Sequence, residues 1–258
     1  MSLRTGILLL SFLTLHSLPS IAQAPASDAK AVVLLNQSLT ASGAGNVGGF
    51  TASGSITYFW AGQAIQSNAT IRAKGGNQFR LDADVPGGTR SVALSRRSGK
   101  RKDADGKLTE IPAHNTTSLG GTSFPYLSIA AVLNDPAYSI AYVGLADVGV
   151  RQAHQVRVTK IFPKDTDPDG VLAKLSQTDY FIDPQSSLVV KTADFTHPIE
   201  NLNENYLREM ELDSYTAMKG VAVPTIVREK IAGQTTWEFR LSTITFNTTL
   251  TDADFVIQ

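Results

Sequence analysis

The sequence contains no cysteine, and this absence excludes several kinds of site. A cysteine nucleophile, an iron–sulfur cluster and a zinc ion held by thiolates all need that side chain. A lipid anchor attached to a processed N-terminus needs it as well. No disulfide can form, so the free energy of folding has to come from a packed core.

Net charge is the second thing the sequence lacks, because 23 lysines and arginines balance 23 aspartates and glutamates. That balance argues against a nucleic-acid partner. The sequence has neither a His-Glu-x-x-His nor a Gly-x-Ser-x-Gly motif. His114, His154 and His197 share no spacing typical of a metal site. We therefore predict a non-enzymatic protein without a cofactor, and keep a hydrolase with a dispersed site as the third alternative.

A long hydrophobic run is missing too, and the N-terminus has only a short one. Residues 7–15 form an apolar segment that follows Arg4 and precedes small residues around Ala22. This pattern is typical of a secretory signal peptide, whereas about 20 apolar residues are needed to span a membrane. We expect residues 1–22 to be a signal peptide and residues 23–258 to form one soluble domain, exported to the periplasm or the extracellular space.

What the sequence does contain is an alternation of apolar and polar residues, which is typical of strands. Glycine-rich connections such as 74–77 and 86–88 are typical of hairpins in an antiparallel sheet. In the last strand, Trp237 and Thr243 are expected on one face and Phe246 on the other. About eleven strands are expected, at residues 50–58, 65–73, 78–85, 90–96, 138–143, 154–161, 175–182, 187–195, 206–215, 221–231 and 237–246.

Two apolar segments have the pattern of helices. Residues 28–42 begin with Asp28 as an N-cap and are followed by Gly43, a residue type that favours the end of a helix. Residues 119–133 are apolar on nearly all sides, and Pro125 within them suits a first helical turn. We expect this second segment to be a short buried helix that covers part of the sheet.

Several short sequences resemble those of a known superfamily. They are Tyr180-Phe181-Ile182-Asp183-Pro184, Gly220-Val221-Ala222-Val223-Pro224 and Thr251-Asp252-Ala253-Asp254-Phe255. Together with the order of the elements, they are similar to the outer-membrane lipoprotein carrier and sorting superfamily, most clearly over residues 135–258. The resemblance implies a mainly β fold: a single curved antiparallel sheet, or unclosed barrel, of about eleven strands with two covering helices. It also implies an apolar concave cavity that takes acyl chains.

Aromatic and aliphatic side chains are the candidates for lining such a cavity. In a sheet with a helical cover, the core and the wall of a cavity are the same surface. The same residues would therefore serve either a filled core or a bound ligand. The candidates are Tyr58, Trp60, Phe124, Leu127, Val132, Trp237 and Phe239.

Two clusters of charge are candidate sites of other kinds. The first would suit an anionic partner or membrane surface, or would be the solvated end of a basic hairpin. Its members are Arg96, Arg97, Lys100, Arg101 and Lys102. The second cluster, Asp165, Asp167 and Asp169, matches the first half of a calcium loop. Ser176 stands where that loop needs a glutamate, so a solvated loop is the better interpretation.

The leading hypothesis for function is an exported, non-enzymatic carrier or binding protein for a lipophilic ligand. An acyl chain or the anchor of an acylated protein would be the ligand, and the helix at 119–133 would be a lid. The alternative is a periplasmic interaction or scaffold module whose concave face is filled by its own side chains. A void beneath the lid would favour the first hypothesis, and a filled face would favour the second.

Overall fold

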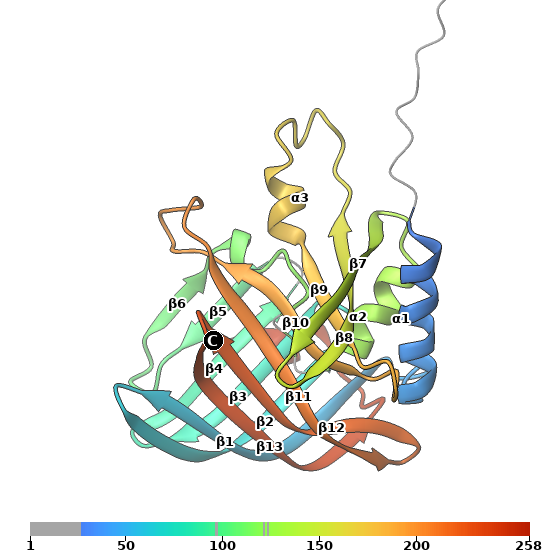
Figure 1. Cartoon of the computed structure of the whole chain (residues 1–258). Coiled ribbons are helices and arrows are strands. Elements are labelled where there is room, and N and C mark those ends of the chain that lie inside the picture. The colour runs from blue at the N-terminus through green and yellow to red at the C-terminus, as the bar shows by residue number, and fades with distance from the viewer. Residues whose placement is uncertain (1–26, 96–97, 121, 123) are drawn as a thin grey trace, which may run out of the picture.

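A computed structural model describes residues 27–95, 98–120, 122 and 124–258. The expected signal peptide, Arg96 and Arg97 lie outside these residues. The described residues form one antiparallel sheet of thirteen strands that is not closed into a barrel, with a few helices (Figure 1). The predicted fold class is thus confirmed, with two more strands than expected.

The strands fall into two sets along the chain. The first set is β1 (Gly49–Trp60), β2 (Gln63–Lys74), β3 (Gln78–Val85), β4 (Gly88–Ser95), β5 (Ser98–Lys102) and β6 (Leu108–Ile111). The second set is β7 (Tyr138–Val148), β8 (Arg151–Lys160), β9 (Thr178–Ile182), β10 (Val189–Thr196), β11 (Tyr206–Met218), β12 (Val221–Ile231) and β13 (Gln234–Phe246). Since β1 pairs with β13, the two sets form one sheet whose edges are β6 and β7.

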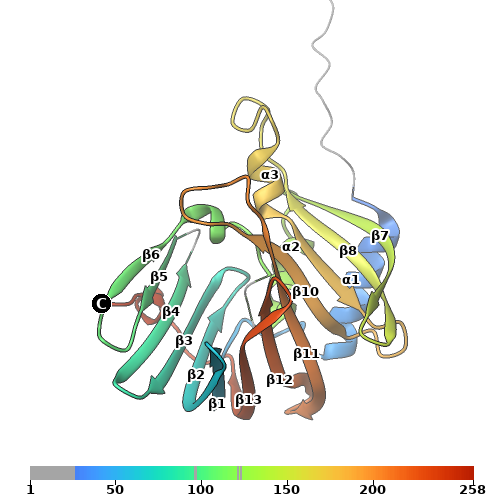
Figure 2. The same cartoon turned by 60° about the vertical axis from the view of Figure 1, so that its left-hand side comes forward.

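The path of the chain places the two sets opposite one another. The chain starts at the centre of the sheet with β1, runs outward to β6, crosses to β7 and returns to the centre with β13. The crossing segment contains a 3₁₀ helix, η1 (Ala113–Asn115), and the helix α2 (Pro125–Leu133). In Figure 2 the two sets form walls on either side of the molecule, with α2 between them.

The first helix, α1 (Ala29–Ser42), agrees with the predicted helix at 28–42. A carboxylate oxygen of Asp28 accepts hydrogen bonds from the backbone N–H of Lys30 at 2.7 Å and of Ala31 at 3.3 Å, which caps the N-terminus. Gly43 follows the helix with a φ of 67°, a conformation that favours glycine.

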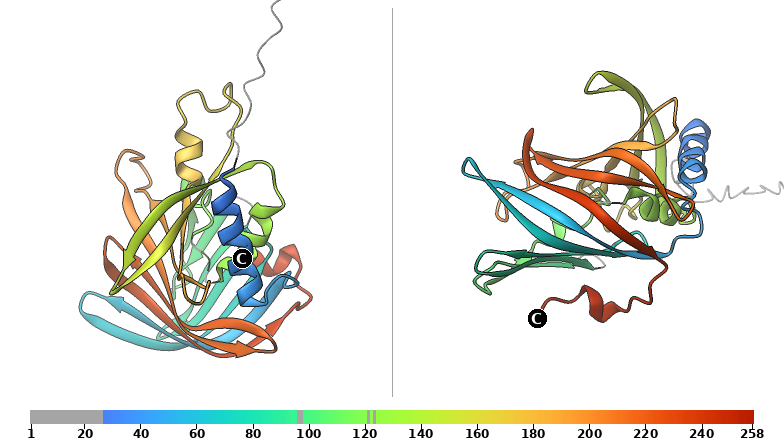
Figure 3. Two further views of the ribbon diagram at one scale, coloured as in Figure 1. Left: turned by 45° about the vertical axis from the view of Figure 1, so that its right-hand side comes forward. Right: turned by 90° about the horizontal axis from the view of Figure 1, so that it is seen from below.

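The second helix, α2, is shorter than the predicted segment 119–133. It begins at Pro125, whose fixed φ and missing N–H suit a first helical position. Both helices cover the concave face, where α1 packs on α2, β7, β8 and β12. Leu35 of α1 and Ile129 of α2 are completely buried. Figure 3 shows the two helices beside one another at one side of the curved sheet.

The two additional strands are β5 and β6, which occupy the region expected to be a solvated hairpin end. No alternation marks β5, because Lys100, Arg101 and Lys102 are polar on both of its faces. Even so, β5 pairs with β4 in regular register, with Arg101 opposite Val92. A short helix, α3 (Val171–Ser176), also replaces the start of the strand predicted from residue 175.

A bulge between β1 and β13 changes which residues face the core. The pairing shifts at Gly54, where an added Cβ would lie 2.0 Å from the carbonyl oxygen of Arg240. Beyond the bulge, Phe246 pairs with the buried Phe50 on the concave face, while Thr243 is exposed. The prediction for Thr243 and Phe246 is therefore wrong, because a bulge interrupts the period of two.

The convex face is covered at β3 and β4 by the C-terminal segment. This segment contains a second 3₁₀ helix, η2 (Asp252–Phe255), and runs along the outside of the strands (Figure 3). It buries Phe255 and Ile257, and Arg80 donates a hydrogen bond to the carbonyl oxygen of Val256 at 2.9 Å. Among the helices of the described residues, none has the length and apolar character needed to cross a membrane.

Candidate functional site

The predicted cavity residues do not lie together but divide between two regions of the concave face. The first region, which we call the α2 core, is buried and contains Phe124, Leu127, Val132 and Phe239. The second region is open, and we call it the aromatic cavity; it is lined by Tyr58, Trp60 and Trp237. The two regions share β1 and β13, which run through both.

The α2 core is filled by side chains. Phe124 packs edge-to-face on Phe50 and on Tyr126, with 5.3 and 5.2 Å between ring centroids. The space left among Phe50, Phe124, Phe239 and their neighbours is a void of about 20 Å³. A void of that volume holds about one water molecule. It is far too small for an acyl chain.

Two tyrosines join the α2 core to the sheet where β10 and β11 separate. The last pair of these strands is Lys191 with Glu211. Beyond it, the hydroxyl of Tyr215 donates to the carbonyl oxygen of Val189 at 2.6 Å, and the N–H of Val189 donates to the hydroxyl of Tyr126 at 3.2 Å. Burial raises the pKa of both phenols. The hydroxyls thus supply the partners that β11 would otherwise give to Val189.

The aromatic cavity has a volume of about 370 Å³, in the lower part of the range of roughly 300–1,000 Å³ typical of small-molecule sites. It lies between β1 and β10–β13 on one side and β3–β6 on the other. Both tryptophans of the chain line it. Other apolar side chains in its wall are Phe79, Leu81, Val92, Leu94 and Ile111.

Two aromatic residues at the end of β1 differ in burial. Tyr58 is 8% exposed and Trp60 is 77% exposed, so Trp60 is a large apolar side chain at the rim of the cavity. The guanidinium of Arg90 lies 4.6 Å from the centre of the Tyr58 ring, a cation–π contact. Burial raises the pKa of Tyr58 to about 12, although the charge of Arg90 acts in the opposite direction.

Arg208 lines the cavity as one half of a buried ion pair. Its Nε and Nη2 donate to the carboxylate of Asp194 at 2.8 and 2.6 Å. The hydroxyl of Ser118 donates to the same carboxylate at 2.5 Å. Burial lowers the pKa of Arg208, but the charge of Asp194, the hydrogen bonds to it and the charge of Glu229 together outweigh burial and raise the pKa. Because Ser118 belongs to the crossing segment, the pair attaches that segment to the sheet.

The structure separates the described members of the basic cluster. Nζ of Lys100 lies 3.3 Å from Glu110, and Nζ of Lys102 donates to the carbonyl oxygen of Gln258 at 3.2 Å. These two lysines alternate along β5 with Arg101, which lines the aromatic cavity. One member of the predicted anionic-partner site therefore shares a site with the predicted cavity residues.

Asp167 of the candidate calcium loop has a structural role. The carboxylate of Asp167 accepts hydrogen bonds from the backbone N–H of Leu172 at 3.0 Å and of Ala173 at 2.8 Å, which caps α3. Asp165 and Asp169 are exposed. Across the part of the chain that the structure describes, no group of three or more His, Cys, Asp or Glu side chains is placed to hold a metal ion.

His154 and His197 have hydrogen-bond partners typical of structural residues, whereas Nε2 of His114 is buried without a hydrogen-bond partner among the described residues. Nδ1 of His154 lies 3.1 Å from the hydroxyl of Tyr142, and Nδ1 of His197 lies 3.1 Å from the carbonyl oxygen of Glu204. The rings of His114 and His197 pack edge-to-face with 5.9 Å between their centroids. The contact of His114 with His197 joins η1 to the end of β10.

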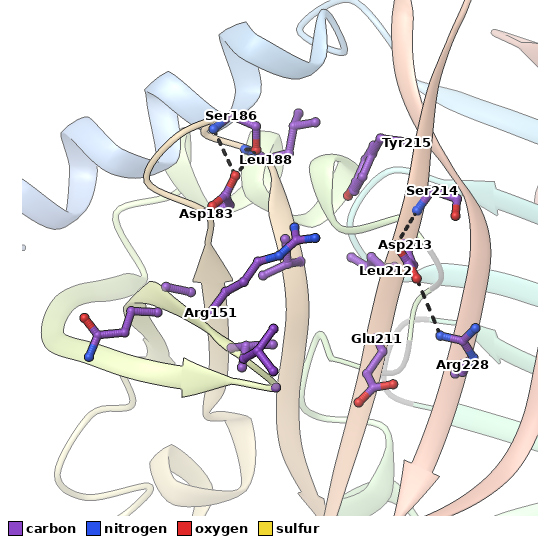
Figure 4. A pocket seen from close by; sticks show the side chains of 16 residues that line it. Arg151, Asp183, Ser186, Leu188, Glu211, Leu212, Asp213, Ser214, Tyr215 and Arg228 are labelled. Atoms are coloured by element: carbon purple, nitrogen blue, oxygen red, sulfur yellow. Dashed lines mark hydrogen bonds and ion pairs between the residues drawn. The ribbon is translucent and has the colours of Figure 1, made fainter.

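The convex face has a groove of about 550 Å³ that the sequence does not predict. Figure 4 shows Asp183 bonded to Ser186 on one side of it and Asp213 beside Arg228 on the other. Burial alone would raise the pKa of Asp183, but hydrogen bonds from the hydroxyl and backbone N–H of Ser186 lower it. The groove is assembled from separate turns and strand segments, and no local pattern marks it.

Several solved structures have a similar arrangement of elements. A DUF1329 family protein from Desulfovibrio piger has a TM-score of 0.53 and 11% identity, over 88% of this chain and 97% of its own. A LolA superfamily protein from Nitrosomonas europaea has a TM-score of 0.53 and 10% identity, over the same shares. This chain has the LolA fold. The predicted resemblance is thereby confirmed at the level of the fold.

A third LolA-like structure is a putative outer membrane lipoprotein-sorting protein domain from Vibrio parahaemolyticus. Its TM-score is 0.52 and its identity 11%, over 88% of this chain and 96% of its own. No protein-family model and no curated protein matches the sequence. The similarity of this LolA-like chain to these proteins is therefore one of fold.

Proposed function

We propose that this chain is an exported, non-enzymatic carrier or binding protein for a lipophilic ligand such as an acyl chain, and that the ligand binds in the aromatic cavity. The observation that supports this most directly is Trp60, which is 77% exposed beside a cavity of about 370 Å³. Concave sites lined by aromatic side chains are typical of small-molecule binding. The LolA fold, shared with a putative lipoprotein-sorting domain, supports the same function.

Burial of a hydrocarbon chain supplies enough free energy for reversible binding. Each methylene removed from water contributes about 0.8 kcal/mol, so a dozen contribute roughly 10 kcal/mol. Association costs about 4–15 kcal/mol in lost freedom of motion. The gain exceeds the cost over the lower part of this range, so a single chain binds weakly and reversibly, as a carrier requires.

Tryptophan fluorescence tests the proposal, because both tryptophans line the cavity. We expect dodecanoic acid, added below its micelle concentration, to change the emission in a saturable way. Val92→Phe fills part of the cavity and should weaken binding about tenfold or more, a change of about 1.4 kcal/mol. The same substitution at the exposed Val143 on β7 is the matched control. Equal affinity in both variants would contradict the proposed site.

The native ligand is identified by a separate measurement. Extraction of the purified protein with organic solvent, followed by mass spectrometry, should release a molecule with a hydrocarbon chain. Val92→Phe should release less of it than Val143→Phe, if the molecule occupies the aromatic cavity. Equal release from the two variants would place the molecule elsewhere on the protein.

An interaction or scaffold module is the second candidate function. The filled α2 core and the groove on the convex face favour it, because a scaffold needs a rigid body and an outer surface. A folded sample that shows no saturable fluorescence change would favour this function over the carrier. Contact of the basic hairpin with an anionic membrane remains a prediction, and the ion pair of Lys100 with Glu110 reduces the charge left for it.

A further inference from the structure

The aromatic cavity combines an apolar wall with two arginines whose positive charges are only partly neutralised by acidic side chains. Arg90 on β4 and Arg101 on β5 both line it. Arg101 pairs with Val92, so Arg90 is its diagonal neighbour on the same face of the sheet. Two guanidinium groups in this arrangement are close enough to share one ligand group.

The two arginines share one nearby carboxylate, that of Asp103. Asp103 lies 4.0 Å from Nε of Arg90 and 3.5 Å from Nε of Arg101, distances too long for good hydrogen bonds. Nε of Arg90 is buried and has no hydrogen-bond partner among the described residues. A buried donor without an acceptor is unfavourable, and no strong hydrogen bond at Nε holds the Arg90 guanidinium away from an anion at the mouth of the cavity.

The cavity has two further charged groups, Arg208 and Glu229. Arg208 is neutralised by Asp194 through two hydrogen bonds. Glu229 lies on β12 and accepts a hydrogen bond from the hydroxyl of Thr236 at 2.6 Å. The β4–β6 side is cationic, since residues 88–111 contain seven lysines and arginines against three aspartates and glutamates. Positive charge is therefore concentrated at Arg90 and Arg101.

The geometry points to an anionic amphiphile as the ligand: one hydrocarbon chain that carries a carboxylate or phosphate head group. The inference rests on the carrier function proposed above and adds the head group to it. The head group contacts Arg90 and Arg101, whose side chains are 34% and 44% exposed at the mouth. The hydrocarbon chain lies between the Phe79–Leu94 wall and Trp237. Guanidinium groups suit both anions because they donate in pairs.

The test compares ligands that differ only in their head groups. Tryptophan emission is followed while dodecanoate, dodecyl phosphate or dodecanol is added to the whole protein below the micelle concentration. We expect both anions to bind about tenfold or more tightly than the alcohol, from hydrogen bonds to charged groups. Inorganic phosphate alone should neither change the emission nor compete, since it lacks the chain. Competition at similar concentrations would identify a plain anion site and overturn the inference.

Charge-removing variants locate the head group. Arg90→Gln and Arg101→Gln should each weaken the anions about tenfold and leave dodecanol unchanged, and unchanged dodecanol binding also shows that the variant is folded. Lys100→Gln removes the same charge from the other face of β5 and is the matched control.

The outcomes separate the two proposals. Equal affinity for dodecanol and the anions, or equal losses in Lys100→Gln and Arg90→Gln, would overturn the head-group inference and leave the carrier function standing. Failure of all three ligands to change the emission would overturn the carrier function itself.

Discussion

The α2 core and the aromatic cavity are built on the same two central strands but are completed differently. β1 contributes Phe50 to the core and Tyr58 to the cavity, and β13 contributes Phe239 and Trp237 in the same way. In the core, aromatic rings at the start of α2 pack against the sheet, and a void of about 20 Å³ remains. In the cavity, where the opposite wall is another part of the sheet, about 370 Å³ stays open.

The difference shows that a helix which covers a concave sheet is not by itself a lid over a ligand. The sequence predicts a lid helix, but the space beneath α2 is filled, as the scaffold hypothesis expects. The open space lies beside the helix, and there the carrier hypothesis keeps its support. The two hypotheses therefore describe different parts of one face, and substitutions that distinguish these parts distinguish the hypotheses.

The largest expected contrast is between Phe124→Ala and Trp60→Ala. Phe124 is 2% exposed and makes aromatic contacts on two sides, so its removal should lower the free energy of unfolding by about 3–5 kcal/mol. Trp60 is mostly exposed, and its removal should change that free energy by about 0.5 kcal/mol or less. Urea unfolding followed by circular dichroism measures both. Similar losses for the two variants would show that the regions are not distinct.

The same pair of variants should differ in the opposite sense in ligand binding. Trp60→Ala removes part of the cavity rim, so we expect weaker binding of dodecanoate, reported by Trp237. Phe124→Ala should keep its affinity at temperatures where it is folded, because its ring lies in the α2 core. Loss of affinity in Phe124→Ala alone would move the ligand site beneath α2.

The sequence could predict the elements whose signals are local. Asp28 and Gly43 mark both ends of α1, and alternation marks most of the thirteen strands. β5 could not be found this way, because an edge strand with polar residues on both faces has no alternation. The bulge at Gly54 depends on the contact with Arg240 from another strand. A contact between residues so far apart in the sequence cannot be predicted from a local pattern of a few residues.

The sequence predicts several residues that line the candidate site, but it does not predict which of them lie together. Aromatic residues in strands look alike in the sequence, whether a helix covers them, as it covers Phe50, or not, as at Trp60. Arg101 belongs to a basic run, and nothing local shows that it alternates toward an apolar wall while Lys100 does not. The site exists because β4 and β5 are brought opposite β13, which only the topology of the whole sheet decides.

A smaller effect is expected from Tyr58 on the cavity side. Its contribution to the free energy of unfolding should disappear at high pH. Its pKa is about 12 in the folded protein and about 10 in an unfolded chain. The folded state holds the proton more tightly, so this contribution is complete below pH 10 and is lost as the pH rises toward 12. A difference of two units corresponds to about 3 kcal/mol.

Comparison of Tyr58→Phe with the unchanged protein isolates this contribution, because burial also raises the pKa of Tyr126, Tyr180 and Tyr215. Unfolding by urea at several pH values between 9 and 12 measures the slope. We expect the variant to lose less stability than the unchanged protein over this interval. Parallel slopes would mean that solvent reaches the phenol, and that the cavity is wider at Tyr58 than the structure indicates.

The smallest expected effect is on the other side of the comparison, at the tyrosine pair that closes the α2 core. Tyr215→Phe removes the hydroxyl that donates to the carbonyl oxygen of Val189 and leaves that buried oxygen without this partner. We expect a loss of about 1–3 kcal/mol in the free energy of unfolding. Tyr206→Phe is the matched control, since the Tyr206 side chain is exposed and should change stability by about 0.5 kcal/mol or less. If the two variants lose the same amount, water already reaches Val189. The α2 core would then be open to solvent between β10 and β11, and the distinction between a sealed core and an open cavity would fail at that point.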